Sequence, residues 1–101
     1  MELTGPQKRR LRSLGHRLDV ALTVGKGGLS EGVAERLREL FTRAELLKVR
    51  LPAGPPAQRQ ALAEELARAA GAALAGSVGR TVLLYRPNES LPPESRIPMQ
   101  D

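Results

Sequence analysis

Hydrophobic residues recur at helical spacing in three stretches of the chain and at alternate positions in several shorter ones. The stretch from Leu3 to Gly15 predicts a first helix, because Thr4 can cap its start and Gly15 can end it. The side that we expect to face the core is formed by Gln7, Leu11, Leu14 and Leu18. The opposite side and its flanks are formed by Lys8, Arg9, Arg10 and Arg12. The pattern therefore predicts an amphipathic helix with one basic surface.

The next apolar runs predict a strand, a helix and a second strand. Hydrophobic residues alternate over Val20–Val24 as in a strand, and Ser30 can cap a second helix over Glu31–Thr42. The apolar stripe of that helix is Val33, Leu37, Leu40 and Phe41. Alternation over Leu46–Leu51 predicts the second strand.

The second half of the chain begins with a loop over Pro52–Pro56, where proline and glycine interrupt regular structure. A third helix follows over Ala57–Ala70, rich in Ala, Leu and Glu, and Gly71 can end it. The last two apolar runs, Ala72–Val78 and Thr81–Arg86, predict two strands joined by a tight turn.

The chain after Pro87 is rich in Pro, Ser and Glu. We therefore expect a folded domain over residues 1–87 and a flexible C-terminal tail over residues 88–101. The element order α-β-α-β-α-β-β predicts one compact α/β sandwich in which helices pack against a four-stranded sheet.

Charge is distributed unevenly along the chain. The formal net charge is +5, and residues 1–26 hold six basic and two acidic side chains, whereas the other 75 residues hold ten and nine. Contact with a polyanion requires such a local excess, although a solvated basic helix without a partner gives the same pattern.

The absence of cysteine excludes disulfides and thiolate metal sites. Since no apolar run has the length of a membrane span and the first residues are charged, we expect a soluble, cytoplasmic monomer without membrane contact.

The residue groups that enzymes use for catalysis are absent from the sequence. His16 is the only histidine, so neither a common zinc site nor a Cys–His pair can form. No serine lies in a nucleophile-elbow pattern, and most carboxylates alternate with arginines as on a salt-bridged solvent surface. We therefore expect a protein that is not an enzyme and that binds no metal, cofactor or small-molecule substrate.

The most informative motif is a glycine-rich loop between the first strand and the second helix. Its residues are Gly25, Lys26, Gly27 and Gly28. Glycines let the backbone approach a ligand with exposed N–H groups, Lys26 adds a full positive charge, and the following helix N-terminus adds a partial one. The loop can hold a phosphate in this way, although Glu31 repels an anion there and a simple tight turn has the same composition. Lys48 and Arg50 share the polar face of the second strand, where they either extend the same surface or are only its solvated side.

Three runs of the sequence, LGHRLDVALTVGKGGLSEGV, AELLKVRL and GRTVLLYRP, resemble the CRM domain, and its stand-alone bacterial YhbY-like form in particular. The resemblance covers roughly residues 3–87. It implies an RNA-binding module with a mixed sheet, similar in fold to the C-terminal domain of bacterial translation initiation factor three. It also implies association with precursors of the large ribosomal subunit.

The family's GxxG loop maps onto the glycine-rich loop described above, and its basic first helix maps onto the first predicted helix. Its closing strand maps onto Leu84, Tyr85 and Arg86, which makes Arg86 a further candidate RNA contact. The sequence departs from the family at Asp19, where such proteins often carry a basic residue, and this lowers the local positive potential.

We therefore predict a protein that contacts structured ribosomal RNA through the GxxG loop and the basic N-terminal helix, in large-subunit assembly. The alternative is a protein-interaction module whose basic helix docks on an acidic partner. Only Phe41 and Tyr85 could stack on bases, so recognition of backbone and shape is the more economical expectation. His16 lies on the Arg9 and Arg12 side if the helix continues through it, where it can contact RNA, cap the helix or pack.

Overall fold

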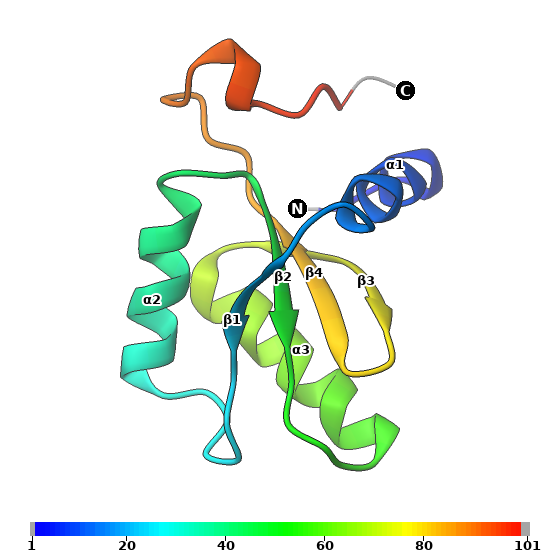
Figure 1. Ribbon diagram of the computed structural model, residues 1–101, viewed down its shortest axis with the longest axis vertical. Helices are drawn as coiled ribbons and strands as arrows, with labels where there is room; N and C mark the ends of the chain where they lie inside the picture. Colours follow the sequence, from blue (N-terminus) through cyan, green and yellow to red (C-terminus); the bar gives the residue numbers. More distant parts are fainter. Residues whose placement is uncertain (1, 100–101) are drawn as a thin grey trace.

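Four strands form one mixed sheet in the computed structural model, which describes residues 2–99 (Figure 1). The strands are β1 (Val20–Thr23), β2 (Leu46–Arg50), β3 (Ala73–Val78) and β4 (Thr81–Tyr85), in the spatial order β1-β2-β4-β3. β1 runs parallel to β2, and the other neighbours are antiparallel. With three helices packed around this sheet, the predicted α/β fold is confirmed.

Side-chain caps start the first two helices, and a glycine ends the third. The helices are α1 (Gly5–Gly15), α2 (Glu31–Phe41) and α3 (Pro56–Ala70), and a short 3-10 turn follows at Pro93–Ser95. At the start of α1, the Thr4 hydroxyl accepts a hydrogen bond from the Gln7 N–H at 3.2 Å, and the Gln7 side chain accepts one from the Thr4 N–H at 2.9 Å. At the start of α2 the Ser30 hydroxyl accepts a hydrogen bond from the Val33 N–H at 3.2 Å, and Gly71 ends α3 with a φ of +64°.

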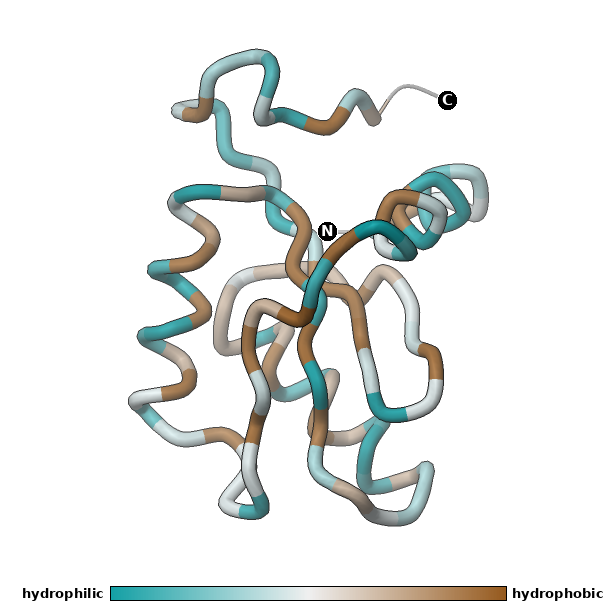
Figure 2. The backbone as a smooth tube through the Cα atoms, viewed as in Figure 1, coloured by the Kyte–Doolittle hydropathy of each residue, from teal (hydrophilic) through white to brown (hydrophobic). Residues whose placement is uncertain are grey.

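α2 and α3 cover one face of the sheet and form the larger part of the core with it. Twelve buried residues make up this cluster, among them Leu37 and Phe41 of α2, Leu66 of α3, and Val49 and Leu84 of the sheet. Figure 2 shows the hydrophobic positions of α2 turned toward the sheet and its hydrophilic positions turned away. Since each fully buried aliphatic or aromatic side chain contributes roughly 1.5–3 kcal/mol, this layer supplies most of the stability of the fold.

α1 covers one end of the opposite face over a smaller core. That core consists of Leu11, Leu46, Ala75, Leu83 and Tyr85. Two glycines let the helix approach the sheet closely, since a Cβ at Gly15 would lie 2.6 Å from a methyl carbon of Leu83. A Cβ at Gly76 of β3 would lie 2.8 Å from Cγ of Arg12. The position of α1 therefore depends on small residues at these two contacts.

The prediction that Leu14 and Leu18 face the core together with Leu11 was wrong. Their exposed fractions are 38% and 37%, whereas Leu11 is fully buried. The reason is that Gly15 occupies the position closest to the sheet, which turns Leu14 to the side of the helix.

The segment after Pro87, which we predicted as a flexible tail, packs across the end of the molecule (Figure 1). We call residues 88–99 the strap. Ile97 and Met99 pack against the core under α1, and the Met99 carbonyl accepts a hydrogen bond from Gln7 Nε2 at 3.0 Å. The strap therefore links the end of β4 to α1. The last two residues of the predicted tail, Gln100 and Asp101, lie outside the described residues.

Glu45, just before β2, holds the strap in place. It is 1% exposed and accepts hydrogen bonds from the backbone N–H groups of Asn88 and Ile97, each at 2.6 Å, and from Arg96 Nε at 3.2 Å. Burial of the Glu45 carboxyl raises its pKa, but these hydrogen bonds and the Arg96 charge outweigh burial, so the pKa lies below its ordinary value. Glu45 is therefore an ionised, buried anchor that the sequence pattern did not predict.

Candidate nucleic-acid interface

α1 leaves one row of residues uncovered on its side of the sheet. In the strand pairing, Thr23 lies beside Arg50, Arg50 opposite Thr81, and Thr81 opposite Val78. Paired residues point to the same face, and Leu83, two residues along β4 from Thr81, packs against α1 on that face. We call Thr23, Arg50, Thr81 and Val78 the open row. Thr23, Arg50 and Val78 are exposed, so this half of the sheet can be reached from outside.

The cations of α1 are all available to solvent. The exposed residues are Lys8, Arg9, Arg10 and Arg12. No acidic residue interrupts the chain between Gly5 and Leu18, so the positive charge of this helix is not neutralised within it. Arg12 also lines a cavity together with Val78 and Thr81, which places the basic helix next to the open row.

The glycine-rich loop, which we call the GKGG loop, follows the other end of the open row directly. The Val24 N–H donates to the Arg50 carbonyl at 2.8 Å, and a turn closed by a 3.0 Å hydrogen bond from the Gly28 N–H to the Gly25 carbonyl follows. Gly28 has a φ of +68°, so the fold itself requires glycine there. Gly25 and Gly27 have no positive φ, and a Cβ at either would meet nothing within 4 Å. The fold therefore gives no conformational or packing reason for glycine at these two positions.

Two arginines that the sequence analysis missed lie at the same end of the sheet as the GKGG loop. Arg59 of α3 lines a depression of about 220 Å³ together with Lys26, and its Nη1 donates to the Gly54 carbonyl, which fixes the guanidinium there. Arg80, in the turn between β3 and β4, donates from Nε to the Leu51 carbonyl at 3.1 Å. The sequence shows only that Arg59 lies in the first turn of a helix that follows the loop after β2. Because β1 and β2 are parallel, that loop and the GKGG loop leave the same end of the sheet.

The basic helix and the GKGG loop are not direct neighbours, although their closeness in sequence led us to expect one shared surface. They lie at opposite ends of β1 (Figure 1), and a four-residue strand spans about 13 Å. The open row fills the space between them and contributes Arg50. The candidate surface is therefore longer than the basic helix and the loop alone, and it consists of α1, the open row and the GKGG loop.

Two of the predicted site residues have other partners in the structure. Lys48 is half-buried, and its Nζ donates to the carbonyls of Gly15 at 3.2 Å and Leu18 at 3.3 Å. This places a cation at the C-terminal end of α1, where it offsets the helix dipole. Arg86 Nη1 donates to the Ala70 carbonyl at 3.2 Å, at the end of α3. Arg86 therefore lies with the α2 and α3 layer, and the structure does not bring it to the other candidate residues.

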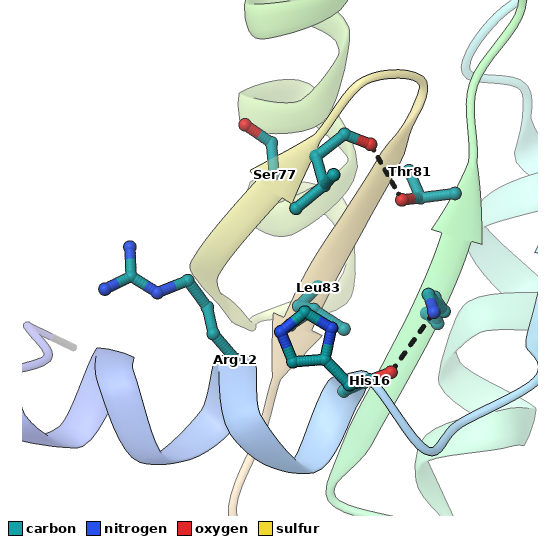
Figure 3. Close-up of a pocket in the computed structure, with 8 residues that line it drawn as sticks. Arg12, His16, Ser77, Thr81 and Leu83 are labelled. Atoms are coloured by element: carbon teal, nitrogen blue, oxygen red, sulfur yellow. Dashed lines mark hydrogen bonds between the residues drawn. The ribbon is translucent and has the colours of Figure 1, made fainter.

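The ring side chains differ in their access to solvent. His16 closes α1 by donating its backbone N–H to the Arg12 carbonyl at 3.2 Å, and its exposed side chain lines the cavity beside Leu83 (Figure 3). Phe41 and Tyr85 are 2% and 4% exposed, so both belong to the core and neither is available to stack on a base. Burial also raises the pKa of Tyr85.

The chemistry that this surface offers is that of cations and main-chain amides. Within residues 2–99, no group of three acidic or histidine side chains lies together as a metal site requires. In the same part of the chain, every buried side-chain nitrogen or oxygen has a hydrogen-bond partner, and no helix is long and apolar enough to cross a membrane.

Comparison with known proteins relates this chain to one family. The family model of the CRS1 / YhbY (CRM) domain matches residues 3–86. The protein named "Probable RNA-binding protein PA4753" of Pseudomonas aeruginosa is 39% identical over 88 residues, which cover 87% of this chain and 85% of that protein. "Probable RNA-binding protein YqeI" of Bacillus subtilis is 34% identical over 84 residues, which cover 83% and 88%.

A solved structure shares the fold. The solution structure of a hypothetical protein of Staphylococcus aureus, described as an RNA-binding candidate, superimposes with a TM-score of 0.81 at 33% identity. The match covers 96% of this chain and all of that one. The segments that build α1, the open row and the GKGG loop all fall within the matched family region.

Proposed function

The chain belongs to the CRS1 / YhbY (CRM) domain family, and on this premise we propose that it is an RNA-binding protein and not an enzyme. It holds the sugar–phosphate backbone of structured ribosomal RNA through α1, the open row and the GKGG loop. It acts during assembly of the large ribosomal subunit. The names of its relatives support the RNA partner, and the resemblance to YhbY-like proteins supports the ribosomal role.

The observation that carries this proposal is the backbone conformation and open surroundings of Gly25 and Gly27 in the GKGG loop. Gly25 and Gly27 have neither a positive φ nor a crowding neighbour, so the folded chain could hold alanine at both positions. They flank Lys26, which is exposed, and they precede the N-terminus of α2, where partial positive charge gathers. Bare backbone beside a cation is what a phosphate needs for close approach to amide N–H groups.

The exposed side chains favour recognition of backbone and shape over base sequence. Phe41 and Tyr85 are buried, so the groups that face the RNA are mainly guanidinium, ammonium and amide groups. Such groups contact phosphate oxygens, which carry no sequence information. Binding of this kind displaces counterions and therefore weakens steeply with salt.

Substitution of the loop glycines tests the proposal. In Gly25→Ala and Gly27→Ala we expect RNA affinity to fall about tenfold, because a methyl group keeps a phosphate from the amides, each charged hydrogen bond being worth about 1.5–3 kcal/mol. The free energy of unfolding should stay unchanged or rise by up to about 1 kcal/mol, because alanine restricts the unfolded chain. Fluorescence anisotropy with a ribosomal RNA hairpin measures the affinity, and thermal melting measures the stability.

Gly28→Ala is the matched control, because its φ of +68° makes alanine costly in the fold itself, by about 1–2 kcal/mol. Full RNA affinity in both Gly25→Ala and Gly27→Ala would remove the loop from the interface.

Crosslinking in cells followed by sequencing of the bound RNA tests the ribosomal partner. If polyglutamate displaces the protein from cell extract particles and RNA does not, the basic helix serves an acidic protein instead.

A further inference from the structure

A cavity of about 190 Å³ lies between the end of α1 and the open row (Figure 3). Its lining comes from three segments far apart in the sequence: α1 and the adjoining His16, Lys48 of β2, and the β3–β4 hairpin. The hairpin contributes Val78, Thr81 and Leu83. Sites for drug-sized ligands have volumes of roughly 300–1,000 Å³, so this cavity suits one small ring system. Phosphate contacts along the surface do not need such a hollow.

The inner wall of the cavity is apolar. Leu83 is 8% exposed and forms part of the core under α1, while Val78 is 69% exposed although it is a large hydrophobic residue. The imidazole of His16 lines the same cavity and adds a planar ring. Flat heterocycles stack on apolar and aromatic side chains of this kind, and every nucleobase has such a face.

The rim of the cavity is cationic. Arg12 and Lys48 line it and no acidic residue does, and the exposed Arg50 lies next to Thr81 in the open row. The Thr81 hydroxyl donates to the Val78 carbonyl at 2.9 Å, which leaves its oxygen lone pairs free to accept from an amino group. An apolar slot bounded by cations matches a neutral ring that carries a phosphate on each side, as a nucleotide within a strand does.

We infer that this cavity takes one unpaired nucleobase of the bound RNA, with the flanking phosphates on Arg12 and Arg50. The inference rests on the proposed function and deepens it, because it names the RNA feature that the protein prefers. A base inside a duplex is stacked between its neighbours and cannot enter, whereas a bulged or looped base can be splayed out. The protein therefore selects RNA with an unpaired nucleotide next to a helix.

Three hairpins of one sequence test this inference: one fully paired, one with a single bulged adenosine, and one with an abasic residue at the bulge. Stacking of one base contributes about 1–3 kcal/mol, so the wild-type protein should bind the bulged hairpin about tenfold more tightly than the other two. The variant His16→Ala/Val78→Ser removes the ring and the exposed apolar wall. It should bind all three hairpins equally, at the affinity that the wild type has for the paired one.

Gln60→Ala/Ala61→Ser, at exposed positions of α3, is the matched control and should keep the preference for the bulge. Lys26→Glu should weaken binding to all three hairpins by the same factor. Equal wild-type binding to the bulged and abasic hairpins would overturn the base site while leaving the phosphate contacts in place. A bulge preference that survives in His16→Ala/Val78→Ser would also overturn it. Absence of binding to every hairpin would contradict the proposed function as well.

Discussion

The two layers that cover the sheet differ in both packing and charge. The α2 and α3 side rests on a cluster of twelve buried residues, whereas the α1 side rests on five. α2 and α3 together carry five glutamates and four arginines, while α1 carries four cations and no acid. The first layer thus has the charge balance of an ordinary solvent surface, and the second has that of a surface for a polyanion.

The comparison indicates a division of roles: one side of the sheet holds most of the buried core, and the other carries the proposed binding surface. The α1 side is held by fewer apolar contacts and needs additional attachments, which are the strap, its Glu45 anchor and the Lys48 contacts with the end of α1. The smaller helical cover also leaves the open row accessible, so that the sheet itself is part of the proposed RNA-binding surface. On the other side, α2 and α3 pack against the sheet and bury Val49, Val82 and Leu84.

The largest expected effect is a loss of stability when the Glu45 anchor of the α1 side is removed. This variant tests whether the α1 side depends on the strap. Glu45→Gln loses the charge that accepts three hydrogen bonds, so we expect the free energy of unfolding to fall by about 2–4 kcal/mol. Hydrogen exchange should show loss of protection first in α1 and the strap, with α2 and α3 protected longer. Equal loss of protection in all three helices would contradict the division between the layers.

The same variant has a defined pH dependence. Because the pKa of Glu45 is lowered in the folded protein, its stabilising effect is complete above the ordinary glutamate pKa of about 4.3. The effect is lost as the pH falls through the lower pKa of the folded state. The stability difference between the wild type and Glu45→Gln should therefore narrow in acid, as measured by urea unfolding at several pH values. A difference that widens in acid would show that the carboxyl is protonated when folded.

A smaller effect is expected from reversing charge on one layer and then on the other. Arg9→Glu/Arg12→Glu should weaken RNA binding about 30-fold at low salt, because two phosphate contacts become repulsive. Arg36→Glu/Arg68→Glu changes the net charge equally on the α2 and α3 layer and should weaken binding less than threefold. Filter binding with a ribosomal RNA fragment gives both values, and circular dichroism confirms folding. Equal losses in the two variants would mean that only net charge matters.

Local features of the fold were predictable because their causes lie close together in the sequence. The stripe that contains Leu37 and Phe41 follows from helical periodicity alone, and Gly71 ends α3 as a glycine at that position does. The GKGG loop was predictable for the same reason, since its glycines are adjacent and a strand and a helix flank it. These features require no knowledge of which segments meet.

Features that depend on contacts between distant segments were not predictable. In the sequence Glu45 is one charged residue among many, and its role depends on hydrogen bonds from the strap, which is about 50 residues away. Arg59 lies near Lys26 only because the loops that precede α2 and α3 leave the same end of the sheet. The partners of Lys48 at the end of α1 are equally distant in sequence. Arg50 was a candidate from the strand pattern alone, but the open row as a whole could not be predicted, because it is defined by what α1 does not cover.

The central claim is that RNA lies on α1, the open row and the GKGG loop and leaves the other layer free. Titration of isotope-labelled protein with a ribosomal RNA hairpin, followed by amide NMR spectra, tests it most directly. We predict the largest shifts at Gly25 to Gly28, at Thr23 and Arg50, and in α1 from Lys8 to His16, with little change along the outer faces of α2 and α3. Shifts centred on α2 and α3, with the GKGG loop unchanged, would contradict the account.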